Sequence, residues 1–425
     1  MMHKKKDHRI EYDVAVIGGG PAGLMSAYVA AMAGKRVIVL EKNPSMGKKL
    51  LITGNGRCNL TNYETDIDRL VQKYGKKGRF LYTGFSIFGP EQTLEFFRKA
   101  GLKTKTERGK RVFPDSDRAE DVLLSLTSGL KLDRVTLKLS SPVKKLFTDN
   151  SRITGIEIQG NISVKARNYI IATGGCSYPE TGSTGDGYYW AKHIGHRINE
   201  PRPSIVPLKT REQWVRELSG LSLKNVALTA FCGEKKILER FGEMLVTHFG
   251  ISGPIVMDCS KYLLENLDKK EVKVFIDLKP ALDHKKLDNR LQRDFLKHRG
   301  KNVSNGLKDL LPSSLVTIIL KTSTIDPEIQ VDQISRSQRK KILSTIKALP
   351  LTISGSLGHK WSIVTNGGVE LSEIEPSSMR SRIMDNLFFA GEVLDLDGPT
   401  GGFNLQVCWT TGYLAGKNAS SSDLF

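Results

Sequence analysis

Residues 12–41 read YDVAVIGGGPAGLMSAYVAAMAGKRVIVLE, and this stretch carries the strongest structural signal in the chain. The apolar run Tyr12–Ile17 stops at a glycine turn and predicts a buried strand, and the small residues that follow predict a helix over Ala22–Ala33. Arg36–Leu40 predicts a second buried strand, which ends at Glu41. A strand, a glycine turn, a helix and a strand in this order form a βαβ unit, whose two strands lie parallel.

The glycine turn has the spacing Gly18-x-Gly20-x-x-Gly23, which is typical of a dinucleotide site. Gly18 permits the tight turn, Gly20 lets the backbone approach a pyrophosphate, and Gly23 lets helix and strand pack closely. The helix that begins near Pro21-Ala22 offers free N–H groups to the pyrophosphate. Glu41 can accept both ribose hydroxyls of an adenosine and would repel a 2′-phosphate, which disfavours NADP. The alternative is a purely structural glycine turn.

Two later apolar runs, Asn168–Ala172 and Asn386–Ala390, also predict strands that end in glycine turns. No second dinucleotide motif is present, so one nucleotide must carry any redox chemistry. Gly391-Glu392, followed by Pro399–Asn404 at the start of a helix, favours FAD over NAD. An acid after a strand can hold a ribityl hydroxyl, and a helix N-terminus can stabilise negative charge on a reduced flavin. Two ordinary turns are the alternative.

The order of these signals predicts a nucleotide-binding domain that other structure interrupts. After the first part of that domain come short β-like runs, then a polar and helical stretch with prolines at its internal boundaries. Strands and glycine turns return near the C-terminus. We therefore expect an FAD-binding domain over 1–198 and 362–425, a β-barrel-like insert over 199–279 and 345–361, and a basic helical insert over 280–344.

The net charge of this 425-residue chain is +19, from 64 basic and 45 acidic residues. Residues 281–350 hold 14 basic and 7 acidic residues, and a second basic cluster spans Arg98–Arg111. Such clusters favour a polyanionic partner, because neutralising phosphates releases counterions. The sequence therefore predicts RNA binding through these two regions, with a merely solvated basic face as the alternative.

Composition excludes several classes of protein. With 39% apolar residues the chain is not expected to be disordered, and five cysteines without a CxxC pair favour the cytoplasm over secretion. The uncharged stretch Val14–Gly34 has the length of a membrane span, but the Gly18–Pro21 turn would break such a helix, so no membrane association is expected. His193 and His196 lack a nearby cluster of other ligands, and no metal site is expected.

Several motifs together resemble the YhiN/BaiN-type flavoproteins, also labelled aminoacetone-oxidase-like FAD-binding enzymes. The matching stretches follow in order along nearly the whole chain: Gly18–Glu41, Met46–Leu50, Thr53–Asn62, Gly182–Gly187, Thr247–Pro254, Thr365–Val369 and Gly391–Asn404. The resemblance implies an α/β fold, with a glutathione-reductase-like FAD-binding Rossmann domain, an inserted β-barrel domain and a helical subdomain. This chain has Asn55 where other members carry a third glycine, which puts the local backbone conformation in question.

The resemblance also implies positions around FAD. Glu41 and Lys42 would line the adenosine side, the backbone of Val143 would contact adenine, and Thr173 and Gly174 would lie near the pyrophosphate. The residues implied near the flavin are Lys49, Arg57, Cys58, Asn59, Gly402, Phe403 and Asn404. Gly56, Gly391, Glu392 and Gly401 are further expected cofactor contacts. A cation at Lys49 or Arg57, close to N1 or O2, would raise the flavin potential, with phosphate anchoring or surface solvation as alternatives.

Three residues are candidates for catalysis: Cys58, Arg57 and His248. Cys58 could act as an acid from the flavin loop, but it lacks a CxxC partner, and a packing cysteine is the alternative. His248 precedes Ser252-Gly253-Pro254, where we expect a helix to begin with Ser252 as its N-cap. It could donate a proton to a substrate, or it could simply structure that turn.

The leading hypothesis is an FAD-dependent oxidoreductase that reduces a uridine to dihydrouridine in large-subunit ribosomal RNA, because the family resemblance includes members linked to this reaction. The reaction needs a hydride donor, a proton donor and a basic surface, and unstacking the base costs roughly a few kcal/mol. The alternative is a small-molecule flavin enzyme that oxidises an aminoacetone-type amine or reduces an enone. A third reading is a protein that binds FAD only as a structural or sensing element. NAD(P)H is the candidate transient reductant, and the oligomeric state is left open.

Overall fold

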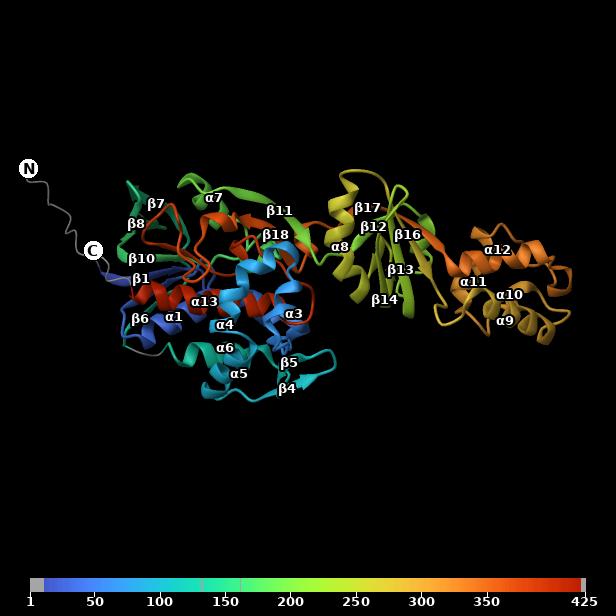
Figure 1. Ribbon diagram of the computed structural model, residues 1–425, viewed down its shortest axis with the longest axis horizontal. Helices are drawn as coiled ribbons and strands as arrows, with labels where there is room; N and C mark the ends of the chain where they lie inside the picture. Colours follow the sequence, from blue (N-terminus) through green and yellow to red (C-terminus); the bar gives the residue numbers. More distant parts are fainter. Residues whose placement is uncertain (1–10, 131–132, 161, 422–425) are drawn as a thin grey trace, which may run out of the picture. The chain divides into compact units, whose positions relative to one another are not determined.

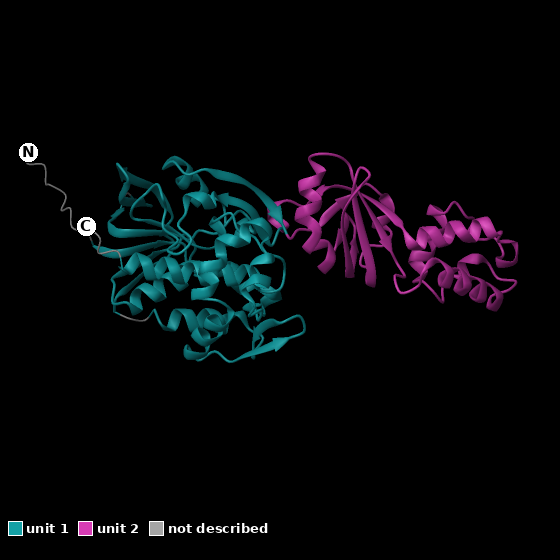
Figure 2. Ribbon diagram, viewed as in Figure 1, with its two compact units in different colours: residues 1–204, 362–425 teal, residues 205–361 magenta. Residues whose placement is uncertain are grey.

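The computed structural model describes residues 11–130, 133–160 and 162–421, which form two compact units (Figures 1 and 2). Unit 1 combines residues 1–204 with 362–425, and unit 2 is the continuous segment 205–361. Each unit has a hydrophobic core of its own, because one cluster of buried side chains draws only on unit 1 and the other only on unit 2. The chain therefore leaves unit 1 once and returns once.

A five-stranded parallel sheet forms the centre of unit 1. Its strands, in spatial order, are β19 (Leu387–Phe389), β10 (Ala166–Ile171), β1 (Tyr12–Ile17), β2 (Val37–Leu40) and β6 (Val135–Lys138). Every pair in this sheet is parallel, and Ile17 of β1 lies opposite both Leu40 and Ile171. The inner strands β1, β2 and β10 are mostly buried because helices and loops cover both faces, whereas the edge strand β6 is largely exposed.

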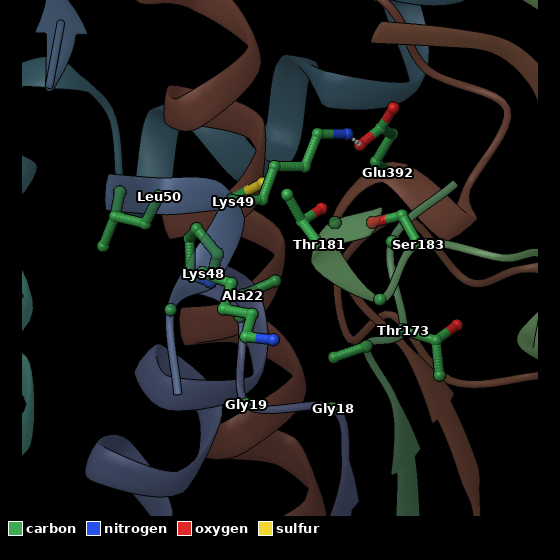
Figure 3. Close-up of a pocket in the computed structure, with 18 of the residues that line it drawn as sticks. Gly18, Gly19, Ala22, Lys48, Lys49, Leu50, Thr173, Thr181, Ser183 and Glu392 are labelled. Carbon is green, nitrogen blue, oxygen red and sulfur yellow. Dashed lines mark hydrogen bonds and ion pairs between the residues drawn. The ribbon is translucent and has the colours of Figure 1, made fainter. Parts of the chain in front are cut away.

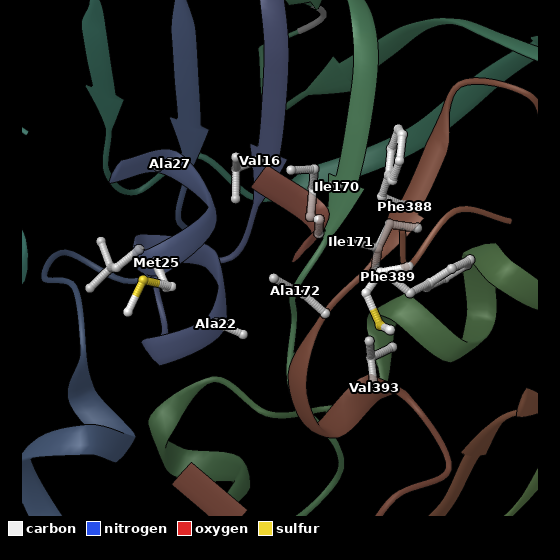
Figure 4. Close-up of a cluster of buried hydrophobic side chains, with 14 of the residues drawn as sticks. Val16, Ala22, Met25, Ala27, Ile170, Ile171, Ala172, Phe388, Phe389 and Val393 are labelled. Atoms are coloured by element: carbon white, nitrogen blue, oxygen red, sulfur yellow. The ribbon is translucent and has the colours of Figure 1, made fainter. Parts of the chain in front are cut away.

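Helix α1 (Pro21–Met32) packs against the long C-terminal helix α13 (Phe403–Ser421), and small residues make the contact close (Figure 1). A Cβ on Gly412 would lie 2.5 Å from the carbonyl oxygen of Ala22, and one on Gly416 would lie 2.5 Å from that of Ser26. The Ser26 hydroxyl donates to the carbonyl of Gly412 at 2.9 Å. Side chains of α1 and of strands β10 and β19 belong to one buried cluster (Figure 4).

Smaller elements complete unit 1. Antiparallel strands form three small sheets: β7 (Val143–Asp149), β8 (Arg152–Ile158) and β9 (Ile162–Val164); β3 (Thr61–Asn62), β5 (Arg111–Pro114) and β4 (Thr104–Glu107); and β11 (Ile198–Ser204) with β18 (Val364–Val369). The remaining helices are α2 (Lys48–Ile52), α3 (Ile67–Gln72), α4 (Tyr82–Ile87), α5 (Pro90–Lys99), α6 (Ala119–Ser128) and α7 (Asp186–His193).

Unit 2 is built on a closed six-stranded barrel. Its strands, in order around the barrel, are β12 (Leu208–Thr210), β15 (Gly250–Ser252), β14 (Lys235–Thr247), β13 (Ser222–Cys232), β16 (Val272–Asp277) and β17 (Leu349–Ser356). Helix α8 (Pro254–Leu267) packs on the barrel, and a helical part follows with α9 (His284–Lys297), α10 (Val303–Gly306), α11 (Ser313–Thr322) and α12 (Arg336–Lys347). Barrel and helices share one buried cluster.

These observations confirm the predicted α/β fold, a Rossmann domain interrupted by a β-barrel and a helical subdomain. Two boundaries differ from the expected ones. The first part of unit 1 continues to Ser204 rather than to residue 198, because β11 pairs with β18 of the same unit. Helix α12 runs to Lys347, past the expected limit at residue 344. Among the residues that the structure describes, no helix is both long and apolar enough to cross a bilayer.

Candidate functional site

The carboxyl edge of the parallel sheet opens into a pocket of about 1270 Å³, counting its open mouth (Figure 3). Strands β1, β2, β10 and β19 all end at this edge, so the residues that follow them meet there. The main lining segments are Gly18–Ala22, Leu40–Asn43, Gly47–Leu50, Ala172–Gly174 and Ala390–Glu392. In open α/β sheets this edge is where ligands bind.

The glycines of the first turn have a backbone geometry that admits no other residue at Gly18 and Gly23. Gly18 has φ +112°, and a Cβ there would lie 2.4 Å from the carbonyl oxygen of Ala172. A Cβ on Gly23 would lie 1.9 Å from the carbonyl oxygen of Gly18, so Gly23 serves close packing behind the pocket rather than its lining. Gly20 has open space where a Cβ would be, and no side chain caps the N-terminus of α1. This turn therefore leaves room for a pyrophosphate at the end of a helix dipole.

Glu41 directly follows β2, and its carboxylate faces the pocket with a side chain that is almost wholly buried. Oε2 accepts the N–H of Gly19 at 2.7 Å, and Oε1 accepts the backbone and side-chain N–H groups of Asn43 at 2.7 and 2.8 Å. A carboxylate has about four acceptor positions, so these three donors leave capacity for a ribose hydroxyl. The protein donors fix the orientation of Glu41 before any ligand arrives.

Lys42 is held by an acid that the motif analysis did not assign. Its Nζ lies 2.8 Å from Oδ2 of Asp186 and also contacts the hydroxyl of Thr184. Both partners belong to the Gly182–Gly187 stretch, which forms the start of α7. Lys42, Asp186 and Val143 all line the pocket, as do Thr173 and Gly174 at the end of β10.

A partly buried ion pair between Lys49 and Glu392 crosses the pocket (Figure 3). Lys49 Nζ lies 2.6 Å from Glu392 Oε2, while Glu392 Oε1 accepts the Ser177 hydroxyl and the Thr365 N–H, each at 2.7 Å. Burial opposes ionisation of Glu392, but Lys49 and these hydrogen bonds outweigh it, so the pKa lies below its ordinary value. Ser177 and Thr365 were absent from the predicted site.

The loop after α2 adopts the conformation that its glycines allow, and Asn55 does so too. Gly54 and Gly56 have positive φ, and Asn55 has φ 56° and ψ 44°, a left-handed conformation that asparagine tolerates better than most residues. Of this loop only Thr53 lines the pocket, whereas Gly56 and Asn59 do not. The departure at Asn55 therefore leaves the local fold intact.

Arg57 was expected near the flavin, but its side chain is bound to acidic residues outside the pocket. It makes ion pairs with Glu107 and with Asp117, the latter at 2.6 Å, and its guanidinium lies 4.1 Å from the centre of the Phe113 ring. These contacts fix Arg57 against the β4–β5 hairpin, and it does not line the pocket. Of the two cations expected near the flavin, Lys49 lines the pocket and Arg57 does not.

Cys58 is fully buried and does not line the pocket. Burial raises the pKa of its thiol to about 12, although a hydrogen bond with Thr53 opposes that shift. A thiol in this environment stays protonated and unreactive at neutral pH. The geometry thus favours the packing alternative for Cys58.

The loop before α13 is tied to the 53–62 loop. A Cβ on Gly402, which has φ +98°, would lie 2.3 Å from the carbonyl carbon of Thr61, so only glycine fits there. Asn62 donates to the carbonyl of Gly401 at 3.1 Å. Asn404 lines the pocket and spans the turn before it by accepting the N–H of Gly398 and donating to its carbonyl. Gly391 also lines the pocket, whereas Gly401, Gly402 and Phe403 support it from behind.

His248 belongs to unit 2, in the turn between β14 and β15, while the pocket belongs to unit 1. Its ring packs edge-to-face on Phe249, with centroids 5.0 Å apart. The expected helix start there was wrong in detail, because Gly253 rather than Ser252 is the N-cap of α8, with Pro254 as the first helical residue. Gly253 has φ +92°, which a serine would adopt only with strain.

Most of the positive charge in the Arg98–Arg111 cluster is neutralised by carboxylates in the folded protein. Within Arg98–Arg111, most cations are paired with carboxylates: Arg98 and Lys99 with Glu95, Lys105 with Asp117, Lys110 with Glu64, and Arg111 with Glu107. Over the described residues only Lys103 and Arg108 of this cluster have no ion pair. The cluster is therefore far less basic than its sequence indicates.

A Rossmann sheet with a dinucleotide-type pocket at its carboxyl edge, interrupted by a β-barrel, is the architecture of flavin-dependent oxidoreductases. The family described as HI0933-like protein Rossmann domain matches residues 12–418. The chain belongs to this HI0933-like family, which confirms the resemblance drawn from the motifs.

Two relatives align with nearly the whole chain. The 3-dehydro-bile acid delta(4,6)-reductase of Clostridium scindens is 32% identical over 419 residues, which cover 96% of this chain and 98% of the relative. A ribosomal RNA dihydrouridine synthase of Haemophilus influenzae is 31% identical over 412 residues, which cover 95% and 98%.

Solved structures share the fold at lower identity. The 3-ketosteroid-delta4-(5alpha)-dehydrogenase of Rhodococcus jostii has a TM-score of 0.55 at 16% identity and covers 98% of both chains. An open flavocytochrome c3 fumarate reductase has a TM-score of 0.53 at 16% identity and covers 96% of this chain and 78% of its own. At this identity the likeness concerns the fold alone.

Proposed function

We propose that this chain is an FAD-dependent reductase that converts a uridine of large-subunit ribosomal RNA to dihydrouridine in the cytoplasm. The observation that carries the proposal is the pocket: a carboxylate oriented for ribose hydroxyls, a glycine turn with open space beside it, and an uncapped helix N-terminus meet at one sheet edge. This donor set fits the adenosine and pyrophosphate of FAD.

Each part of the pocket has a role in holding the cofactor. Glu41 would bind the ribose, the Gly18–Gly20 turn and the N-terminus of α1 would bind the pyrophosphate, and the Lys49–Glu392 pair would lie towards the flavin. Reduced FAD supplies the hydride. Because Glu392 is already engaged by Lys49, Ser177 and Thr365, it stays ionised and can accept a hydroxyl of the cofactor chain without moving.

An RNA substrate is supported by the charge of unit 2 and by the Haemophilus influenzae relative. Residues 205–361 hold 27 basic and 17 acidic residues, a net charge of +10 in the smaller of the two units. A steroid-sized substrate gives no reason for this excess, whereas a polyanion does. NAD(P)H is the proposed reductant, docking transiently, because no second dinucleotide motif accompanies the first.

Deletion of the gene, followed by nucleoside mass spectrometry of large-subunit ribosomal RNA, tests the proposal. We expect dihydrouridine to disappear and to return with the wild-type gene. Complementation with Glu41→Arg should fail, because the guanidinium would remove the ribose acceptor and the purified variant should be colourless. Unchanged dihydrouridine in the deletion strain would rule out the RNA substrate.

A second candidate is reduction of a small conjugated enone, and the 32% identity to the Clostridium scindens bile acid reductase favours it. Anaerobic mixing of the reduced protein with a steroid enone separates the two candidates. Rapid flavin reoxidation by the enone, together with none by RNA, would establish the small-molecule function. Reoxidation by unmodified ribosomal RNA alone would establish the first.

A further inference from the structure

Several exposed cations on the helices of unit 2 make no close ion pair with a carboxylate. Of the basic residues in α9 and α12, five are exposed and make no ion pair within 4 Å among the described residues: Lys285, Arg293, Arg336, Lys340 and Lys341. By contrast, Arg290, Lys297 and Arg339 of the same helices are each paired with an aspartate. The unpaired charges are thus a subset that the fold leaves open to solvent.

Three of these cations lie within four residues, along their own helix, of the contact between α9 and α12. Arg339 Nε of α12 lies 2.8 Å from Asp288 Oδ1 of α9, so these two residues mark the contact between the helices. Arg336 and Lys340 lie either side of Arg339 and share a helix face, since residues four apart are neighbours. Lys285 lies one turn before Asp288 on α9. We call Lys285, Arg336 and Lys340 the basic seam.

The acid beneath the seam does not cancel its charge. Asp288 is engaged by Arg339 and also accepts from the Gln292 amide at 2.8 Å, and the Arg339 contact holds the pKa of Asp288 below its ordinary value. The exposed acid Asp283 faces Lys286 at 3.9 Å, and Lys285 also helps to hold the pKa of Asp283 below its ordinary value, so two lysines share this one carboxylate. The seam therefore keeps a net positive charge, unlike the paired 98–111 cluster.

We propose that the basic seam on α9 and α12 is the surface through which this protein docks the phosphate backbone of RNA. The identity of the polyanion rests on the proposed function, whereas the location rests on the ion pairs and exposure described here. The neighbouring exposed positions Asn289, Gln292, Ser337 and Ser344 are polar, and Leu296 near the end of α9 is a single exposed apolar side chain rather than part of an apolar face. A helix that enters a membrane interface needs an apolar face instead, and phosphate contacts need only cations and polar groups.

The test is RNA binding by the full-length holoprotein as a function of salt. Labelled large-subunit ribosomal RNA made in vitro is titrated with wild type and with Lys285→Gln/Arg336→Gln/Lys340→Gln. Loss of three phosphate contacts should reduce the slope of log Kd against log salt by about 2–3 and weaken binding on the order of 100-fold near 0.1 M salt. Because these side chains are exposed, the melting temperature and flavin content should stay as in wild type.

The matched control removes the same number of charges from the other basic region. Arg98→Gln/Lys99→Gln/Arg111→Gln takes away three cations that are paired with Glu95 or Glu107, and we expect the salt slope to stay as in wild type. Lys285→Arg/Lys340→Arg keeps the seam charge and should bind normally. If the seam variant kept the wild-type slope, or the control variant lost it, the location would be wrong.

Binding to vesicles rich in phosphatidylserine tests the alternative that the seam binds an anionic membrane surface. Seam-dependent binding to vesicles with unchanged RNA binding would replace this proposal with a membrane surface. The outcome is separable from the reaction itself. If RNA binding depends on the seam but the protein forms no dihydrouridine, the docking surface is retained and the proposed reaction is rejected. If dihydrouridine forms equally well in the seam variant, the reaction is retained and the docking surface is rejected.

Discussion

Lys49 and Glu392 show how a single contact ties the pocket to the stability of unit 1. Both side chains are less than a quarter exposed, and the carboxylate also accepts from Ser177 and Thr365. Removing one partner of a buried pair leaves the other charge without compensation. The pair is therefore expected to matter even in the absence of a cofactor.

We predict that Lys49→Met lowers the free energy of unfolding by about 3 kcal/mol at neutral pH. In wild type the pKa of Glu392 is below its ordinary value of 4.5, so its contribution is complete above that pH and is lost as pH falls through the depressed pKa. Urea unfolding at pH 7 and at about pH 4 should therefore show that the difference in unfolding free energy between wild type and Lys49→Met is smaller at the lower pH. An equal difference at both would mean that the charge of Glu392 is not involved, and Lys49→Met/Glu392→Gln should lose less than the single variant.

Cys58 gives a prediction of a second kind, namely that a residue within the 53–62 motif is dispensable for the chemistry. Its buried thiol has a pKa raised to about 12, so it cannot exchange a proton near neutral pH. Cys58→Ala should keep kcat and its pH profile, at a cost of about 1 kcal/mol in stability from lost packing. Steady-state kinetics across pH 6–9 checks this, and a lost limb in the pH profile would restore Cys58 as an acid.

Among the elements, the contact between α1 and α13 is the one that holds the glycine turn in place. Gly412→Ala adds a Cβ 2.5 Å from a backbone oxygen of α1, which cannot move as a side chain can. We expect a loss of about 1–3 kcal/mol despite the better helix propensity of alanine. Thermal unfolding measures it, with the exposed Lys417→Ala on the same helix as the control, expected within about 0.5 kcal/mol. Equal melting temperatures for the two variants would contradict close packing here.

Elements with local signals were predictable, and contacts between distant segments were not. Residues 12–41 contain both strands, the turn and the acid, so α1 and β2 lie within a residue or so of the expected ranges. Ser177 and Thr365 become partners of Glu392 only when the loop after β10 and strand β18 come together in the fold. No spacing in the sequence predicts that contact. Likewise Arg57 meets Glu107 and Asp117 through a separate hairpin, which a charge count cannot show.

At the scale of the whole molecule, the two cores are separate and unit 2 is one continuous segment. We predict that residues 205–361 fold alone, with a cooperative urea transition and no bound flavin, because their barrel and helices bury a common cluster. Circular dichroism and flavin absorbance check this. As a control, shortening the segment to end at residue 347 should abolish the transition, since it removes β17 and opens the barrel.

The antiparallel pairing of β11 with β18 brings the exit and the re-entry of the chain next to each other, with Ser204 opposite Val364. An insertion whose two ends are neighbours can be exchanged without changing the path of the host domain. Evolution could then vary what is recognised while the redox half stays constant, which suits a family whose named members act on a bile acid and on ribosomal RNA. Chimaeras joined at Ser204 and Ser362 would test whether unit 2 sets the choice of substrate.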